Sequence, residues 1–356
     1  MSVSPFTFFR GSAAIMASDL AATPSVGLTV QLCGDAHLAN FVLYGSPERN
    51  LLFDVNDFDE TLPGPFEWDV KRLAASFTVA AQHRDFHPEA QRRLAETVTR
   101  SYRLAMQRFA RKGWLPLREL PEAQTADQAR VAVEQTFGSY RDSLPESTRW
   151  LVDRYRLEDV ALKVVGVGSV GTRCWVALLL GRHHEDVLLL QVKEATDSVL
   201  ERHLPASRFR LHGRRVVEGQ RLMQAASDIF LGWSGSVADR HYYWRQLRDW
   251  KGAADLETGR VEGAERYAEV CGYTLARAHA VSGDPAAIAG YLGNGTSFDV
   301  AVAEFSTRYA AQNLTDYHAF TQAIADGLAV DTESWRHQPP AASRSQRAKS
   351  AAHHER

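Results

Sequence analysis

The chain has 356 residues and a formal net charge of −2, with a balance of apolar and charged residues that is ordinary for a globular protein. This charge excludes a general attraction to nucleic acid or to an anionic membrane, and no apolar run is long enough to span a bilayer. Three dispersed cysteines, and a start without the basic-then-apolar pattern of a secretion signal, predict a cytoplasmic protein with reduced thiols.

The chain begins with a strongly apolar segment, residues 5–11, which contains three phenylalanines. A frayed terminus would not need these aromatic side chains, so we expect them to dock on the core. Arg10 in this segment has two interpretations. It could reach a phosphate, or it is a surface charge beside a turn glycine, which is the more frequent situation.

Two short apolar runs, residues 28–32 and 51–55, are predicted strands, and acidic and amide residues follow each of them at once. The first strand leads into the sequence GDAHLAN at residues 34–40, and the second leads into NDFDE at residues 56–60. Packing alone does not require this repetition, so the two loops are predicted to form the functional centre. Asp54, beside the second loop, is interpreted as a turn residue.

The middle of the first half is predicted to be mainly helical. Pro63-Gly64-Pro65 predicts a turn, and apolar residues at helical spacing from Trp68 to Ala81 follow it. Further helices are predicted at residues 88–111, near 126–137 and at 147–155.

From Lys163 onward the pattern changes to a strand, a glycine-rich turn and a second strand. The turn contains Gly166, Gly168, Ser169 and Gly171. Because these glycines join two strands and do not open a helix, they argue against a Rossmann dinucleotide site. A glycine-rich hairpin can instead lay its backbone N–H groups over phosphates.

A third strand, residues 186–192, ends at Lys193, where a charged amine is costly unless an anion receives it. Phosphate oxygens and a carboxylate would satisfy this amine; a lysine that extends to solvent from an edge strand is the alternative. A helix at 214–226, strands at 228–233 and 241–247, and helices at 263–281 and 298–328 are predicted next. Residues from Asp331 to the end are predicted to be disordered.

The acidic loops contain the groups that phosphoryl transfer needs. One carboxylate, Asp35, can accept the proton of an attacking hydroxyl, and a second carboxylate, Asp57, can hold Mg²⁺ with the amide oxygen of Asn40. Carboxylate and amide oxygens suit Mg²⁺, whereas the dispersed cysteines do not form a zinc site. Asp59 is either a further metal ligand or a solvated charge. The alternative for each of these residues is a simple turn cap.

Residues 34–40 resemble the catalytic loop G-D-x-H-x-x-N of the aminoglycoside and choline kinase branch of the protein-kinase-like fold. Asp57-Phe58 resembles the metal-binding aspartate and its neighbour, and Trp68-Asp69 resembles a pair that supports the loop. The resemblance implies that residues 166–171 and Lys193 hold ATP, with Glu218 as the helix partner of the lysine and Glu201 as the second choice. It also implies a hinge at residues 245–249, and it relates the helix ending in His279 to the one before the catalytic loop. A histidine normally precedes Gly-Asp in this loop, and Cys33 stands in its place.

The motifs occur in the reverse order from those kinases, so the resemblance predicts a circular permutation cut between the His279 helix and the catalytic loop. The expected fold is α+β, with two lobes. Residues 1–156 begin a mainly helical catalytic lobe, residues 157–252 form a β-rich nucleotide lobe, residues 253–330 complete the catalytic lobe, and residues 331–356 form the tail.

Nearly the whole span 1–325 also resembles an uncharacterised bacterial family, domain of unknown function 2252. Its pattern is matched by CGDAHLANF, FDVNDFDETLPGPFEWDVKRLA, GVGSVGTRCWVALL, QVKEA, RVVEGQRLMQ and LARAHA. Members of that family normally have more chain before Phe6, so a shortened start is expected.

Together these features predict a phosphotransferase that uses ATP and Mg²⁺ and acts on a small molecule. A nucleotide-binding regulator without turnover and a nucleotidyltransferase remain alternatives, because the same lobes can hold ATP in either role. A metal-dependent phosphohydrolase that uses Asp35, His37, Asp57 and Asp59 is a third alternative, in which Lys193 has no role.

Overall fold

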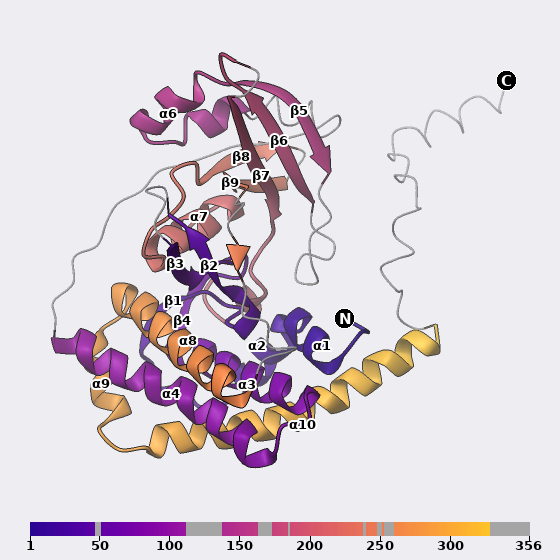
Figure 1. The fold of residues 1–356 in the computed structure, drawn as a ribbon, viewed down its shortest axis with the longest axis vertical. Helices are drawn as coiled ribbons and strands as arrows, with labels where there is room; N and C mark the ends of the chain where they lie inside the picture. Colours follow the sequence, from indigo (N-terminus) through magenta and orange to yellow (C-terminus); the bar gives the residue numbers. More distant parts are fainter. Residues whose placement is uncertain are drawn as a thin grey trace.

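The computed structural model describes residues 1–46, 51–111, 137–162, 173–183, 186–237, 240–247, 251–252 and 260–327. Helices and antiparallel sheets both occur in these residues, and the protein is of the α+β class. The largest sheet lies at one end of the molecule and the longest helices lie at the other, with the small sheets between them (Figure 1). Among the described residues, no helix combines the length and apolarity needed to cross a membrane.

The largest sheet has five antiparallel strands in the order β5-β6-β7-β9-β8. The strands are β5 (Arg156–Leu162), β6 (Cys174–Leu180), β7 (Val187–Ala195), β8 (Gly232–Val237) and β9 (Arg240–Gln246). A short 3-10 turn, η3 (Val199–Arg202), and the helix α7 (His212–Met223) connect β7 to β8. Between the predicted hairpin strands, residues 163–172 lie outside the described residues.

The two faces of this sheet pack against different parts of the chain. Apolar side chains of β6, β7 and β9, among them Leu190 and Trp244, pack with Tyr140 and Leu144 near α6 (Glu146–Val152). On the other face, Trp233 and Tyr243 join the main core together with residues of α7. Because both faces are covered, Lys193 near the end of β7 is only 3 % exposed.

Two smaller sheets carry the acidic loops. β1 (Thr29–Leu32) pairs with β4 (Leu62–Pro65), and β2 (Phe41–Gly45) lies between β3 (Leu51–Val55) and β10 (Lys251–Gly252). The predicted turn at Pro63-Gly64-Pro65 is therefore wrong. In this two-stranded ladder every strand has an open edge, so proline is tolerated.

The helical end consists of α3 (Phe66–His83), α4 (Pro88–Arg111), α8 (Val261–Ser282), α9 (Pro285–Leu292) and α10 (Ser297–Ala325). Two N-terminal helices, α1 (Pro5–Gly11) and α2 (Ala13–Ala21), pack beside α3 and α10 (Figure 1). Phe8 and Phe9 of α1 are buried, which confirms that the apolar start docks on the core. The predicted tail at residues 331–356 and nearly all of the helix near 126–137 lie outside the described residues.

The end of α8 lies next to β1, although the two are far apart in sequence. The backbone N–H of Gln31 donates to the Ser282 hydroxyl at 2.9 Å, across a separation of 251 residues. A Cβ on Gly283 would lie 2.6 Å from Val30. The strand that precedes the first acidic loop thus begins beside the helix that ends with His279-Ala280-Val281-Ser282.

Helices α4 and α8 pack closely at Gly272, where an added Cβ would lie 2.3 Å from the backbone oxygen of Val98. We therefore expect Gly272→Ala to lower the free energy of unfolding by about 1–3 kcal/mol, because backbone must shift to admit the methyl group. The matched control is Gly263→Ala in the same helix, where nothing lies within 4 Å of the added Cβ. This control should raise stability by up to about 1 kcal/mol. Urea denaturation measures both, and equal effects of the two substitutions would contradict the close approach.

Candidate functional site

The two acidic loops lie directly against each other. Gly34 has a φ of +84°, and a Cβ at this position would lie 2.2 Å from the backbone oxygen of Glu60. Only glycine meets both conditions, because L side chains disfavour this φ and no space exists for a side chain. The Thr61 hydroxyl donates to Leu32 O at 2.6 Å, and the backbone N–H of Asn56 donates to Asn40 O at 2.9 Å. The two loops that the sequence singled out are therefore in direct contact.

Asp69, in the first turn of α3, anchors the backbone of the first loop. Its carboxylate accepts hydrogen bonds from the backbone N–H groups of Cys33 at 2.8 Å and Gly34 at 3.1 Å. It also lies 3.2 Å from His279 Nε2, and the other ring nitrogen lies 2.9 Å from the Tyr102 hydroxyl. Because a carboxylate can only accept, Nε2–H donates to Asp69 and Nδ1 accepts from Tyr102. The imidazole of His279, supplied by α8, thus stands beside the loop in which Cys33 replaces the expected histidine.

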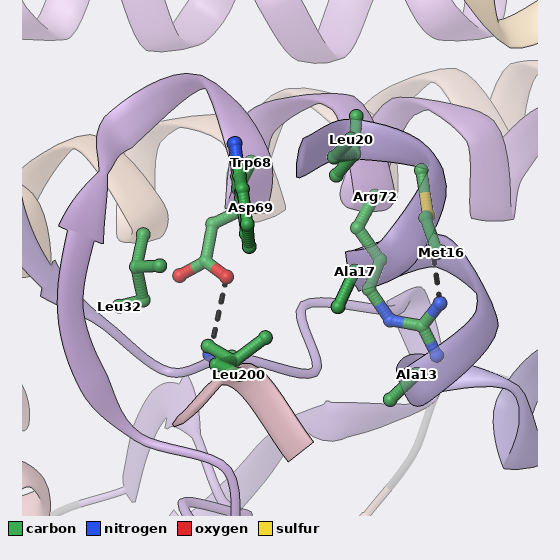
Figure 2. A pocket seen from close by; sticks show the side chains of 10 residues that line it. Ala13, Met16, Ala17, Leu20, Leu32, Trp68, Asp69, Arg72 and Leu200 are labelled. Atoms are coloured by element: carbon green, nitrogen blue, oxygen red, sulfur yellow. Dashed lines mark hydrogen bonds between the residues drawn. The ribbon is translucent and has the colours of Figure 1, made fainter. Parts of the chain in front are cut away.

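Arg72, one turn further along α3, binds Asp35. Its Nε donates to Asp35 Oδ1 at 2.6 Å, and its Nη2 lies 2.5 Å from the same oxygen. Figure 2 shows Asp69 and Arg72 projecting from α3 into one small pocket, Arg72 toward Met16 of α2. The guanidinium also donates to the backbone oxygen of Phe9 at 3.0 Å. Arg72 therefore orients the carboxylate and links it to the N-terminal helices.

His37 lies beside the same carboxylate, with Nε2 3.6 Å from Asp35 Oδ2. The side chain is buried, and its Nδ1 has no hydrogen-bond partner. Burial lowers the pKa of His37 to about 4, and the charges of Arg72 and Arg10 act in the same direction, whereas Asp35 opposes them. The imidazole is therefore neutral near pH 7.

Asn40 ends the short 3-10 turn η1 (Leu38–Asn40), which shapes the loop after Asp35. The side-chain amide of Asn40 donates to the backbone oxygen of Asp35 at 2.8 Å. Because the nitrogen is used in this way, the atom that Asn40 offers to a cation is its amide oxygen.

Lys193 reaches the second acidic loop. Its Nζ lies 3.6 Å from Asp57 Oδ2 and forms a close ion pair with Asp59 Oδ2. The Tyr243 hydroxyl donates to the other oxygen of Asp59 at 2.8 Å, and the Asp59 backbone N–H donates to Asp57 Oδ1 at 3.2 Å. Asp57, Asp59 and Lys193 thus form one charged cluster between the large sheet and the second loop.

The neighbouring charges give the two carboxylates different acidities. Partial burial opposes ionisation of Asp57, but Lys193 and Arg245 outweigh it and hold the pKa of Asp57 well below its ordinary value. Partial burial and the charge of Asp57 raise the pKa of Asp59. Burial alone would lower the pKa of Lys193, yet Asp57 and Asp59 raise it well above the ordinary value. Asp57 is therefore an anion, and Lys193 a cation, throughout the neutral range.

Several predictions about the surroundings need correction. Glu218 is not brought to Lys193: the ion pairs of the lysine run to Asp57 and Asp59, whereas Glu218 pairs with Arg214 at 3.3 Å. The second choice, Glu201, lies 3.7 Å from Arg215.

The resemblance implies a hinge at residues 245–249, but Arg245 lies inside β9, where its side chain donates to Asn56 O at 2.9 Å. Asp54 is no turn residue. It is buried in β3 and forms an ion pair with Arg277 at 2.6 Å. The predicted phosphate-covering residues Gly166, Gly168, Ser169 and Gly171 lie outside the described residues.

Sequence reasoning missed Arg72, Tyr243 and the role of Arg245. The spacing of Arg72 from Asp69 was a usable signal, because residues three apart share a face of a helix. No comparable signal marks Tyr243 or Arg245, which reach the site through the pairing of β9 with β7.

The cluster does not form a complete metal site from side chains alone. Among the described residues, no group of three His, Cys, Asp or Glu side chains is placed to hold a metal ion. Mg²⁺ in phosphotransferases, however, is bound through one or two carboxylates together with substrate phosphates and water. The anionic Asp57 and the amide oxygen of Asn40 fit that requirement, and Asp59 is engaged by Lys193 and Tyr243.

Comparison with known proteins gives one match. A family model described as "Uncharacterized protein conserved in bacteria (DUF2252)" matches residues 1–119 and 113–323. No curated protein and no solved structure matches the chain. The family resemblance inferred from the sequence is thereby confirmed over nearly the same span.

The anchor at Asp69 can be tested directly. Asp69→Asn turns an acceptor-only group into one whose NH₂ must face a backbone N–H, so we expect a loss of about 2–3 kcal/mol in the free energy of unfolding. Amide exchange at Gly34 should become faster, because this N–H loses its charged acceptor. Asp316→Asn, on the exposed part of α10, is the control. Unchanged exchange at Gly34 in the Asp69 variant would show that the loop is held in another way.

Glu60 generates a prediction about pH. Partial burial raises the pKa of Glu60 to about 7, against the hydrogen bond from Val199 N–H. The folded state then binds more protons than the unfolded state between about pH 4.5 and 7, so this group lowers stability as pH rises through that window. Glu60→Gln should remove this part of the pH dependence, on the order of 2 kcal/mol between pH 5 and pH 8. Urea denaturation at both pH values measures it, with exposed Glu89→Gln as control. An unaltered pH dependence in Glu60→Gln would contradict the raised pKa.

Proposed function

We propose that this chain, which belongs to the DUF2252 family of uncharacterised bacterial proteins, is an ATP- and Mg²⁺-dependent phosphotransferase that acts on a small molecule. One observation carries the proposal: Lys193 of the large sheet lies 3.6 Å from Asp57, while the loop of Asp57 rests on the loop of Asp35. A cation for phosphates, an anion for the metal and a candidate base thus occur together. Phosphoryl transfer requires these three groups.

The connections around the lysine support the same proposal. In protein kinases the ATP-binding lysine lies on the third strand, and a helix that supplies its partner follows. Lys193 lies on the third strand of the large sheet in chain order, and α7 follows it. The contact between Ser282 at the end of α8 and Gln31 in β1 fits a permuted kinase-like fold, because an unpermuted chain would run from that helix into the catalytic loop.

We propose one role for each of these residues. Asp35, oriented by Arg72, accepts the proton of the acceptor hydroxyl. Asp57 and the amide oxygen of Asn40 bind Mg²⁺, which supplies charge neutralisation when it is bound. Lys193 binds the α- and β-phosphates.

In this structure Lys193 forms ion pairs with both Asp57 and Asp59. Nucleotide binding would exchange one carboxylate for phosphate oxygens. We assign this exchange to Asp57, because Asp59 has the closer contact and a second bond from Tyr243. Asp59 thus takes the place that a helix glutamate has in protein kinases.

Loss of Asp57 should abolish nucleotide binding that depends on the metal. Saturating Mg-ATP, at about a hundredfold its dissociation constant, should stabilise the wild-type protein by roughly 2.7 kcal/mol. Asp57→Ala should show no such stabilisation in thermal unfolding, whereas exposed Asp142→Asn should keep it. A full shift in Asp57→Ala would remove Asp57 from the metal site.

Asp35→Asn should separate binding from chemistry. We expect this variant to keep the stabilisation by Mg-ATP and to lose phosphotransfer by at least about 100-fold, because it lacks a base. Hydroxylated metabolites and aminoglycosides, screened with labelled ATP, provide the assay. Release of AMP and pyrophosphate would instead indicate nucleotidyl transfer. Phosphate release from phosphoesters without ATP would indicate a phosphohydrolase.

A further inference from the structure

A cavity of about 520 Å³ lies beside the acidic loops, although no residue of either loop lines it. The ladder of β1 and β4 forms its floor, α7 forms a wall, and the segment 204–209 and Ser282 complete the lining. Two lining residues contact Thr61, directly after the second loop: Arg215 donates to its backbone oxygen at 2.9 Å, and Gln31 donates to its hydroxyl at 2.8 Å. The cavity is therefore separate from the proposed phosphotransfer centre, and its volume is in the range of small-molecule sites.

Apolar side chains of this lining are left half-buried. Leu204 and Phe209 in the segment before α7, and Leu222 in α7, each keep part of their surface accessible to solvent. Pro63 of β4, in the floor, is exposed. Apolar surface in a concave site gains free energy when a ligand removes it from water. The cavity therefore fits a ligand with an apolar body.

The charges of the lining favour an anionic ligand. Glu218, the carboxylate of the lining, is paired with Arg214 at 3.3 Å. Arg215 is buried, and Glu201 lies 3.7 Å from its Nε. Arg208 is exposed, its guanidinium lies 4.7 Å from the centre of the neighbouring aromatic ring, and no carboxylate in the described part of the chain pairs with it. The guanidinium of Arg208 thus lacks a carboxylate at the cavity.

We propose that this cavity is a second small-molecule site, for a ligand that has an apolar ring and one anionic group. The ring would lie between Phe209 and Leu222, where apolar surface is available. The anionic group would bind the guanidinium of Arg208, which pairs with carboxylate, phosphate or sulfonate oxygens through parallel N–H donors. The site does not depend on the proposed function, because no residue of its lining takes part in phosphoryl transfer.

The test uses the full chain and two fluorescent dyes of similar size. Anilinonaphthalene sulfonate has aromatic rings and one anionic group, and phenylnaphthylamine has the same rings without the anionic group. The anionic dye should bind more tightly than the neutral dye, because only the anionic dye can pair with Arg208. Hydrogen–deuterium exchange should show that the bound dye slows amide exchange in the segment 204–209 and in α7, which locates the binding at the cavity.

Two pairs of variants separate the charge from the apolar surface. Arg208→Gln should weaken binding of the anionic dye by roughly two- to fivefold, the range of an exposed ion pair, and leave the neutral dye unchanged. Arg210→Gln is its control, because it removes an exposed arginine that does not line the cavity. Leu222→Gln should weaken binding of both dyes at least about fivefold, because the apolar wall becomes polar. Leu104→Gln, at an exposed position of α4, is the control for that substitution.

Three results would overturn the inference. They are a neutral dye that binds as tightly as the anionic one, an equal loss of both dyes in Arg208→Gln, and slowed amide exchange only in other segments of the chain. Failure of the wild type to bind either dye would overturn it as well. Thermal unfolding checks that each variant is folded. If Leu222→Gln does not fold, the comparison of Arg208→Gln with Arg210→Gln still decides the question, because both positions are exposed.

Discussion

The pair of hydrogen bonds from Cys33 and Gly34 to Asp69 is the constraint on which the rest of the site depends. It fixes a loop that has little regular structure of its own to the first turn of a buried helix. From that point the loop can touch Glu60 and present Asp35 to Arg72. The anchor is itself held by His279 and Tyr102, so α3, α4 and α8 all contribute to the position of a single carboxylate.

The site is also organised by alternating charge. Three carboxylates of the two loops face cations from other elements: Asp35 faces Arg72 of α3, and Asp57 and Asp59 face Lys193 of β7. Such pairs are costly to bury and are maintained only where geometry supports them. In this protein Lys193 comes from the large sheet and Arg72 comes from the helical end, so the ion pairs connect the two ends of the molecule through the acidic loops. A ligand that replaces one carboxylate would weaken this connection.

The sequence predicted those parts that depend on local periodicity. The helix predicted at 88–111 and the strand predicted at 51–55 are both present, because apolar spacing along the chain indicates them. The approach of Lys193 to Asp57 was also anticipated, from the resemblance of the motifs. Choice of partner was not predictable in the same way. Lys193 forms its ion pair with Asp59 and not with Glu218, and Asp54 pairs with Arg277. Strand register and helix placement decide which oppositely charged side chain lies within reach.

The contact between β1 and the end of α8 has a consequence for biosynthesis. A ribosome releases the two acidic loops early, but Ser282 and His279, which complete their surroundings, emerge more than two hundred residues later. Until then the apolar faces of α3 and α4 lack α8, and the nascent chain must persist with an incomplete core. We expect closure over so long a separation to slow folding. Cellular chaperones that shield nascent polypeptides would therefore have an extended period in which to engage this protein.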